Sequence, residues 1–455
     1  MSESRREALG SQYETPVGSF FRLVSFISAP AQAAEPQVAV ENQQERHERV
    51  PSVYVAEGAP GAPVVLVALK NPGPYNMVAP LFQGLRNRGY TVVLYGLGVA
   101  ESKLTTATQK EESEISGFVR VAHTYLQTVQ PDVIIRTATD LNRGNEQVLT
   151  SDEEARWWRA TVVNVEDAPG NGHNPDKGSV LSNDIVVTID DHEAVVAEGR
   201  NPADGRDRRV VAVGRPDCDV IDLADPEVER TKASKHLNEK YGIPESNSVV
   251  YFSGQLAPAA PTALEQFARG LRNIDPAGIT FVYAFHPRVF QPSGESMPDQ
   301  ASFVLRAREI FAELRATGLD VVVVGDPGVV GPERADEDIE HLGWRSDLTV
   351  GTHPTEGYNA LHRGVPTMYI GVPGGPKDTP IAVRSGAAFT VSVEDSDDVV
   401  GEKITNALTN ETERADHIQK GKQAVKGDGK ATDRFLSVID DAAAQGVEMR
   451  DFGHP

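Results

Sequence analysis

The fold class of this chain is decided by residues 64–95, which read VVLVALKNPGPYNMVAPLFQGLRNRGYTVVLY. The apolar run Val64–Leu69 predicts a strand that is buried on both faces. After a Gly/Pro-rich loop, apolar residues recur at four-residue intervals and predict a helix over about 76–88. Gly89 ends that helix, and Thr91–Tyr95 predicts the next strand. A strand, a helix and a second strand in this order form the βαβ unit from which parallel sheets are built.

The same alternation continues on both sides of residues 205–225. In the first half we expect a helix over Glu112–Val129 and further strands at Ser52–Ala56, Asp132–Arg136, Thr161–Val165, Asp184–Thr188 and Arg209–Val213. In the second half we expect strands at Val249–Ser253, Thr280–Phe285, Asp320–Val324, Leu348–Val350, Thr367–Ile370 and Ala388–Val391. The pattern predicts an α/β fold with two doubly wound, parallel-sheet, Rossmann-like lobes facing a cleft. Ligands of such sheets bind beyond the carboxyl ends of the strands, so the cleft is the expected site.

Four segments follow from this reading. Residues 1–50 are expected to be a mobile N-terminal arm, 51–214 an N-terminal α/β lobe, 215–430 a C-terminal α/β lobe, and 431–455 a C-terminal helix and tail. The arm contains the apolar stretch Ser19–Ala34. We do not expect a secretion signal there, because Arg22 interrupts the stretch and acidic residues precede it.

The composition excludes several classes of function. The chain has 455 residues and a formal net charge of −22, which opposes binding to nucleic acid or to an anionic membrane surface. No apolar run approaches the ~18 residues of a membrane span, so we expect no integral membrane segment. The single cysteine, Cys218, rules out an intrachain disulfide and favours a reducing, cytoplasmic location. Motifs for zinc proteases, Walker loops, dinucleotide binding and serine hydrolases are missing, so we expect no metal and no cofactor.

The stretch GTHPTEG at residues 351–357 follows a predicted strand and opens a predicted helix. Free backbone N–H groups at a helix start bind anions, and a threonine hydroxyl adds a donor. We therefore take Thr352, His353, Thr355 and Glu356 as candidate residues for binding a phosphate. The alternative is that the threonines and Glu356 only cap the helix.

Other strand ends carry further candidates. His286 and Arg288 follow one strand, Gly254 follows another, and Arg215 lies where the chain crosses between the lobes. An imidazole can transfer protons near neutral pH, and a guanidinium pairs well with phosphate. The alternatives are a histidine that ends a strand and a hinge turn with an exposed arginine.

The first lobe adds a loop and a carboxyl pair. Asn71 and Gly73 lie in the Lys70–Pro74 loop, where backbone N–H groups are available at a helix start. Glu166 and Asp167 follow a strand, and two adjacent carboxyls can have pKa values that differ enough for acid–base chemistry. An ordinary βα turn and a solvated loop are the alternatives.

Two stretches resemble a known enzyme group. SDLTVGTHPT at 346–355 and ALHRGVPT at 360–367 are similar to the donor-site signature of GT-B fold enzymes, which include nucleotide-sugar glycosyltransferases and UDP-N-acetylglucosamine 2-epimerases. The resemblance implies that the C-terminal lobe binds the nucleotide and that the helix start holds its diphosphate. The acidic residue that grips the ribose in this group falls at Asn359 here, and Glu356 is the neighbouring substitute.

The 2-epimerases resemble this chain at four more places: Met77–Leu81, Phe285–Arg288, Val163–Gly170 and Gly427–Ala431. This implies that His286 faces the nucleotide and that Glu166 is a catalytic acid/base. The epimerases also carry an aspartate after the strand that precedes the catalytic glutamate. The nearest acid in this chain, Asp140, is out of register with that position. The last of the four stretches is expected to start the final helix, with Thr432 or Asp428 near its cap.

We therefore expect a glycosyltransferase-like enzyme that uses a nucleotide-sugar donor. The alternatives are a 2-epimerase-like isomerase and a non-catalytic nucleotide-sugar-binding protein. The expected partners are the nucleotide-sugar substrate and an acceptor of unknown identity, with a homodimer as a candidate assembly.

Overall fold

A computed structural model describes most of the chain. The described residues are 52–70, 72–108, 113–137, 160–166, 184–199, 209–255, 260–290, 300–328, 336–352, 355–372 and 380–451. The predicted arm and three predicted site residues, Asn71, Asp167 and His353, lie outside these ranges. For Arg288, another predicted site residue, only the backbone is described.

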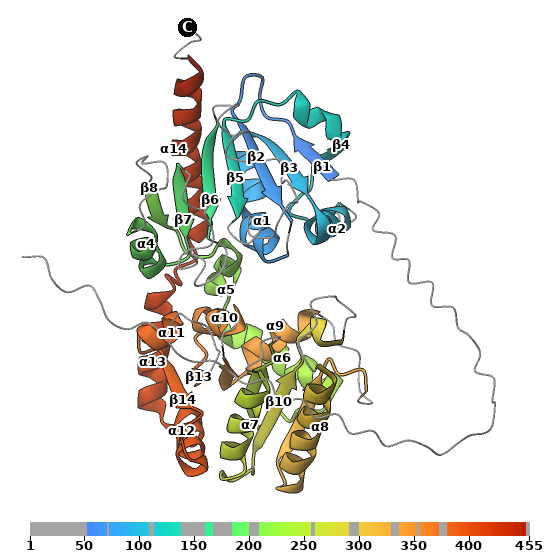
Figure 1. Ribbon diagram of the computed structural model, residues 1–455, viewed down its shortest axis with the longest axis vertical. Coiled ribbons are helices and arrows are strands. Elements are labelled where there is room, and N and C mark those ends of the chain that lie inside the picture. The colour runs from blue at the N-terminus through green and yellow to red at the C-terminus, as the bar shows by residue number, and fades with distance from the viewer. Residues whose placement is uncertain are drawn as a thin grey trace, which may run out of the picture. The chain divides into compact units, whose positions relative to one another are not determined.

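The first sheet has the strand order β4-β1-β3-β2-β5-β6-β7-β8 (Figure 1). Its strands are β1 Ser52–Ala56, β2 Val64–Leu69, β3 Thr91–Gly96, β4 Val119–Val121, β5 Val133–Thr137, β6 Thr161–Val165, β7 Ile185–Thr188 and β8 Arg209–Ala212. All neighbours from β3 to β8 are parallel, which confirms the predicted fold class. At one edge, however, β1 is antiparallel to β3, and β4 is antiparallel to β1.

The helix predicted over Glu112–Val129 is wrong. Residues Val119–Val121 form β4, and a 3₁₀ helix, η1, spans His123–Gln127. Gly117 has a φ of 83°, a left-handed conformation that interrupts a helix. The β-branched Val119 and Val121 pair instead with residues of β1.

The second sheet is parallel throughout, in the order β11-β10-β9-β12-β13-β14. Its strands are β9 Ser248–Ser253, β10 Ile279–Ala284, β11 Asp320–Val324, β12 Leu348–Gly351, β13 Thr367–Gly371 and β14 Ala388–Ser392. Every strand predicted in this half is present, because continuous apolar runs identify strands that helices cover on both faces. The boundary near residue 214 stays a prediction.

Helices connect these strands. The first half contains α1 Pro72–Asn87, α2 Gly98–Ala107 and α4 Asp191–Glu198. The second half contains α5 Asp219–Leu223, α6 Pro226–Tyr241, α7 Ala260–Leu271, α8 Gln300–Ala316, α9 Asp336–Arg345, α10 Thr355–Arg363, α11 Ile381–Arg384, α12 Asp397–Thr409 and α13 Glu411–Ala424. Helix α1 begins earlier than predicted, because proline is well accommodated in the first helical turn.

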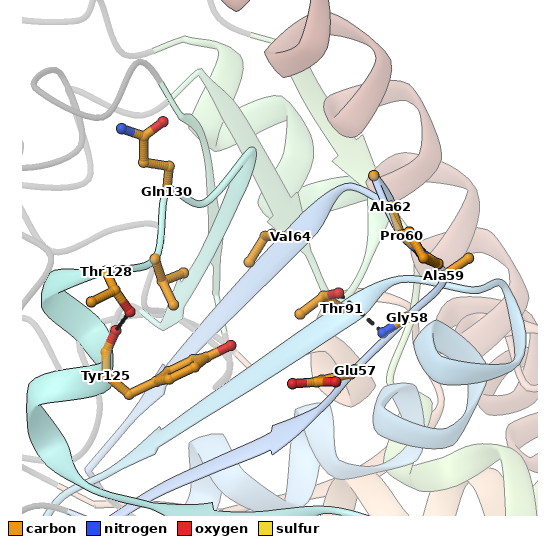
Figure 2. A pocket seen from close by; sticks show the side chains of 12 residues that line it. Glu57, Gly58, Ala59, Pro60, Ala62, Val64, Thr91, Tyr125, Thr128 and Gln130 are labelled. Atoms are coloured by element: carbon orange, nitrogen blue, oxygen red, sulfur yellow. Dashed lines mark hydrogen bonds between the residues drawn. The ribbon is translucent and has the colours of Figure 1, made fainter.

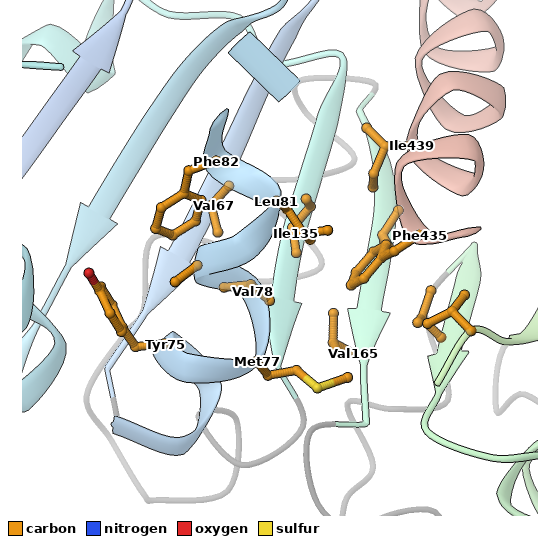
Figure 3. Packing of buried hydrophobic residues seen from close by; sticks show 14 of the residues in the cluster. Val67, Tyr75, Met77, Val78, Leu81, Phe82, Ile135, Val165, Phe435 and Ile439 are labelled. Atoms are coloured by element: carbon orange, nitrogen blue, oxygen red, sulfur yellow. The ribbon is translucent and has the colours of Figure 1, made fainter. Parts of the chain in front are cut away.

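The final helix, α14 (Ala431–Asp451), packs on the first sheet although it follows the second in sequence. Phe435 and Ile439 of α14 are fully buried in the same cluster as Ile135 of β5 and Val165 of β6 (Figure 3). Leu81 of α1 belongs to this cluster too. The C-terminal helix therefore completes the core of the N-terminal sheet.

The start of α14 is capped by a residue from far away in the sequence. The backbone N–H groups of Ala431 and Thr432 donate to the two carboxylate oxygens of Asp219, at 2.9 and 2.7 Å. The stretch starts the last helix as expected: Thr432 lies in its first turn, and Asp428, just before it, accepts the Lys430 N–H at 3.1 Å and pairs with Arg434 at 2.8 Å. An acceptor on α5 reaches the Ala431 and Thr432 N–H groups because the chain folds back on itself.

Candidate active site

The carboxyl ends of β9 and β12 form the switch point of the second sheet. From β9 the chain moves outward to β10 and β11, and then returns to β12 on the other side of β9. Gln255 follows β9 and Thr352 follows β12, and the Thr352 hydroxyl donates a hydrogen bond to Oε1 of Gln255. Thr352 is buried. Since ligands of doubly wound sheets bind at such points, this link marks the expected ligand site.

Helix α10 starts just beyond this switch point. Its first residue, Thr355, is exposed, and N–H groups in the first turn of a helix have no partner within the helix and favour an anion. Glu356 in the same turn is buried, and its carboxylate is held by the Arg363 guanidinium and by Asn359 Nδ2 at 3.1 Å. The Arg363 charge offsets the negative charge of Glu356. Binding of ribose by Glu356 stays a prediction.

Arg215 is buried against α10, but its charge is already paired. Its Nε donates to Asp217 Oδ1 at 3.1 Å, and its Nη2 donates to the other oxygen of the same carboxylate. A third bond reaches Asn359 Oδ1 at 3.3 Å, and the guanidinium lies 5.4 Å from the centre of the Tyr358 ring. Burial is the largest single effect and lowers the pKa of Arg215, but Asp217, Cys218 and Tyr358 together raise it further, so the pKa lies above its ordinary value. A phosphate would have to compete with Asp217 for this side chain.

The ends of β9 and β10 are tied together through Gly254. Its N–H donates to Ala284 O at 2.9 Å, so this group is not free to bind a phosphate. A Cβ at this position would lie 2.5 Å from the same oxygen, which is why glycine is needed here. His286 follows β10 and is half-buried. Its place at the carboxyl edge agrees with the predicted position, but its predicted role in catalysis is untested.

In the first sheet, Glu166 lies directly after β6 and is fully buried. Its backbone N–H donates to Val187 O at 2.8 Å, which continues the pairing of β6 with β7. Gly73 is exposed in the first turn of α1, which follows β2. Both residues therefore lie at the carboxyl edge of their sheet, as predicted.

A buried acid that was not predicted, Asp190, lies at the same edge. Asp190 caps α4 by accepting the Glu193 N–H at 2.9 Å, and it is 1% exposed. Burial raises its pKa, against the opposing effect of the Glu193 hydrogen bond. The adjacent Ile189 carbonyl accepts a hydrogen bond from Tyr358 of α10 at 3.3 Å. The sequence signal for Asp190 is an acid two residues after a buried apolar strand, β7.

Two buried polar residues inside strands were also not predicted. Arg136 of β5 and Asn164 of β6 are paired in register, and both are buried. A charged or amide side chain in an otherwise mainly apolar strand, such as VIIRT and TVVNV, is the sequence signal that could have found them.

Two hollows in the described residues lie away from the switch point. One, of about 370 Å³, is lined by Glu57, Thr91, Tyr125, Thr128 and Gln130 among others (Figure 2). It sits at the amino ends of β2 and β3, the edge opposite to the one where ligands are expected. Another, of about 550 Å³, is mainly apolar and lies between Phe290 and α8. The predicted single pocket shared by Thr355, His286, Arg215 and the Lys70–Pro74 loop stays a prediction.

Neither a membrane span nor a metal cluster is found in the described ranges. Their helices are too short or too polar to cross a bilayer. No group of three or more His, Cys, Asp or Glu side chains is placed there to hold a metal ion. The predicted absence of a cofactor stays a prediction.

Comparison with solved structures identifies the fold. Residues making up 83% of this chain superpose on all of the UDP-GlcNAc 2-epimerase from Neisseria meningitidis, solved bound to UDP-GlcNAc, with a TM-score of 0.57 and 12% identity. A glycosyltransferase from Rickettsia africae gives a TM-score of 0.55 at 11% identity, over 84% of this chain and 99% of that one. The Anabaena HepE protein, in complex with UDP and glucose, gives 0.53 at 14% identity, over 84% of this chain and 100% of that one. No protein-family model and no curated protein matches the sequence. The chain therefore has the GT-B fold, as its sequence resemblance implied.

Proposed function

We propose that this chain is an enzyme acting on a nucleotide sugar, and specifically a glycosyltransferase. The observation that carries the proposal is the Thr352–Gln255 link at the switch point, followed at once by the start of α10. The proteins that share this fold include one solved with UDP and glucose and one solved with UDP-GlcNAc.

The start of α10 is suited to the diphosphate of such a donor. It offers backbone N–H groups, the positive end of a helix dipole and the exposed Thr355 hydroxyl. The one acid of this turn, Glu356, is neutralised by Arg363, so it opposes an anion less than a free carboxylate would. We assign Arg215 a supporting role, because it holds Asn359 and packs on Tyr358 of the same helix.

Sugar transfer needs two further things. The acceptor hydroxyl must lose a proton as its oxygen bonds to the anomeric carbon, and the bond from that carbon to the diphosphate must break. The buried carboxyls Glu166 and Asp190 at the edge of the first sheet are the proposed bases. The diphosphate leaves carrying the negative charge that the α10 start stabilises.

A 2-epimerase is the second candidate, favoured by the position of Glu166 after β6. Such an enzyme removes and returns a proton at C2 of the sugar, so it depends on a carboxyl of this kind. Glu166→Gln should abolish turnover of an epimerase, while a transferase should keep part of its activity. Analysis of the products from UDP-GlcNAc distinguishes the two, since only an epimerase yields the C2 epimer.

Calorimetry with UDP and GDP tests the phosphate site. Thr355→Ala should weaken nucleotide binding by about 1–2 kcal/mol, the scale of one charge-assisted hydrogen bond. The matched control is Thr409→Ala at the exposed end of α12, which should leave the affinity unchanged. An unaltered affinity in Thr355→Ala would remove the phosphate from this loop. Failure of the unmodified protein to bind any nucleotide would overturn the proposed function.

A further inference from the structure

Asn164 is a polar side chain enclosed in an apolar strand. It lies in β6, whose sequence is TVVNV, and its exposed fraction is 0%. Neither its amide nitrogen nor its carbonyl oxygen has a hydrogen-bond partner within the part of the chain that the structure describes. The backbone of β6 is paired on both sides, so only the side chain is left unsatisfied.

On its face of the sheet, Asn164 has apolar neighbours on one side and charged residues on the other. Val186, its partner in register on β7, and Val162, two residues earlier, are both apolar and buried. Arg136 of β5 is its partner in register and is 2% exposed. Glu166 lies two residues further along the chain, and because side chains alternate along a strand, it follows on the same side. Val163 and Val165 point to the other face, into the core that α1 and α14 cover. Arg136, Asn164 and Glu166 therefore form a polar cluster on one face, at the carboxyl half of β5 and β6.

An unpaired buried amide costs folding free energy, and an apolar side chain of similar size at the same place would not. The arrangement makes physical sense if a group from outside the chain supplies the missing bonds. A primary amide offers two donors and an acceptor, which matches a hydroxyl group that both accepts and donates. Sugar rings present hydroxyls of this kind, and the cluster lies at the edge of the sheet where ligands bind.

We propose that Asn164 binds a sugar hydroxyl of the substrate, and so determines which sugar the enzyme accepts. This inference rests on the proposed function, and it names a residue of the first sheet in addition to the nucleotide site on the second. The hydroxyl belongs either to the donor sugar or to a sugar acceptor. Comparing the affinity for UDP-GlcNAc with its turnover distinguishes these two sources.

The test replaces Asn164 with leucine, which is apolar and close in size. Three quantities are compared with the unmodified protein: the urea midpoint of unfolding, the affinities for UDP and UDP-GlcNAc, and the turnover of UDP-GlcNAc. Asn164→Leu should raise the midpoint while turnover falls about tenfold or more, the effect of losing one hydrogen bond to substrate. The affinity for UDP should not change. Asn164→Ala provides the same functional readouts if leucine does not fit.

Thr161→Val is the matched control. Thr161 lies at the amino end of the same strand, is 1% exposed, and has a hydroxyl without a partner in the described ranges. Its replacement should also raise the midpoint, but it should leave both affinities and turnover unchanged.

The outcomes distinguish a donor-sugar contact, an acceptor contact and a purely structural role for Asn164. A lower affinity for UDP-GlcNAc relative to UDP assigns Asn164 to the donor sugar, while unchanged affinities with reduced turnover assign it to the acceptor. Unchanged affinities and turnover in both Asn164→Leu and Asn164→Ala would overturn the inference and leave a structural residue or one paired with a buried water. If the unmodified protein binds no nucleotide, the proposed function itself fails.

Discussion

Asp190 and Glu356 show how the surroundings of one carboxyl decide what it can do. Glu356 is buried beside the Arg363 guanidinium, so its charge is balanced inside the protein. Asp190 is buried at the cap of α4, where burial outweighs the hydrogen bond from Glu193 and the charge of Arg384, and its pKa is raised. A buried carboxyl with a raised pKa, such as Asp190, is suited to acid–base chemistry.

The raised pKa of Asp190 predicts a specific dependence of stability on pH. The folded state binds this proton more tightly than the unfolded state, so stability falls as pH rises from about 3.8 through the higher folded pKa. Asp190→Asn keeps a good helix cap and removes the buried charge. The variant should be more stable than the unmodified protein at pH 7, and the difference should vanish below about pH 3.8.

Urea unfolding at several pH values measures this difference. The control is Asp191→Asn, since Asp191 is exposed and its pair with Lys426 is a surface one. A variant at position 190 that is less stable than the unmodified protein at pH 7 would show that the carboxylate is stabilised by its neighbours after all.

Among the elements, α14 shows most clearly how separate segments depend on each other. Its buried residues complete the core of the first sheet, and its first turn is held by Asp219 of the short helix α5. A buried carboxylate at a helix start satisfies two N–H groups and also interacts favourably with the helix dipole. The start of α14 therefore depends on the side chain of Asp219, a residue far away in the sequence.

Asp219→Ala should lower the free energy of unfolding by about 1–2 kcal/mol, because it removes both acceptors and the charge. Asp219→Asn should cost less, since its carbonyl oxygen can still accept one bond. Asp416→Ala is the control: this residue of α13 is exposed and pairs with Lys420, so its loss should cost less than about 0.5 kcal/mol. Equal, small losses at both positions in urea unfolding would refute the capping role.

The molecule as a whole carries far more negative than positive charge. Its 66 acidic residues exceed the 44 lysines and arginines, for a formal net charge of −22. Described ion pairs such as Arg272–Glu313 and Arg306–Glu265 are partly exposed and contribute little each, so repulsion among the surplus carboxylates dominates the surface.

Sodium chloride should therefore stabilise the protein. Raising its concentration from about 0.02 to about 0.5 M screens the repulsion, and the midpoint of thermal unfolding at pH 7 should increase. The same series near pH 4, where many carboxyls are protonated, should show a smaller rise. A midpoint that falls with salt at pH 7 would mean that surface ion pairs outweigh the repulsion.

The sequence by itself determined the fold class and most strand positions, because strands covered on both faces require continuous apolar runs that can be read locally. It also placed Thr352, Thr355, Glu166 and Gly73 at the carboxyl edges of strands. This succeeded because βαβ connections put each strand-end loop on the same edge of a sheet.

Features that depend on contacts between distant parts of the chain were decided only by the tertiary structure. The antiparallel edge strands β1 and β4, the return of α14 to the first sheet, and its cap by Asp219 all depend on residues far apart in the chain. The same holds for the pairing of Arg215 with Asn359 and for the enclosed amide of Asn164. A local pattern shows which side chains are polar, but whether a polar group is paired or unpaired depends on neighbours that only folding brings together.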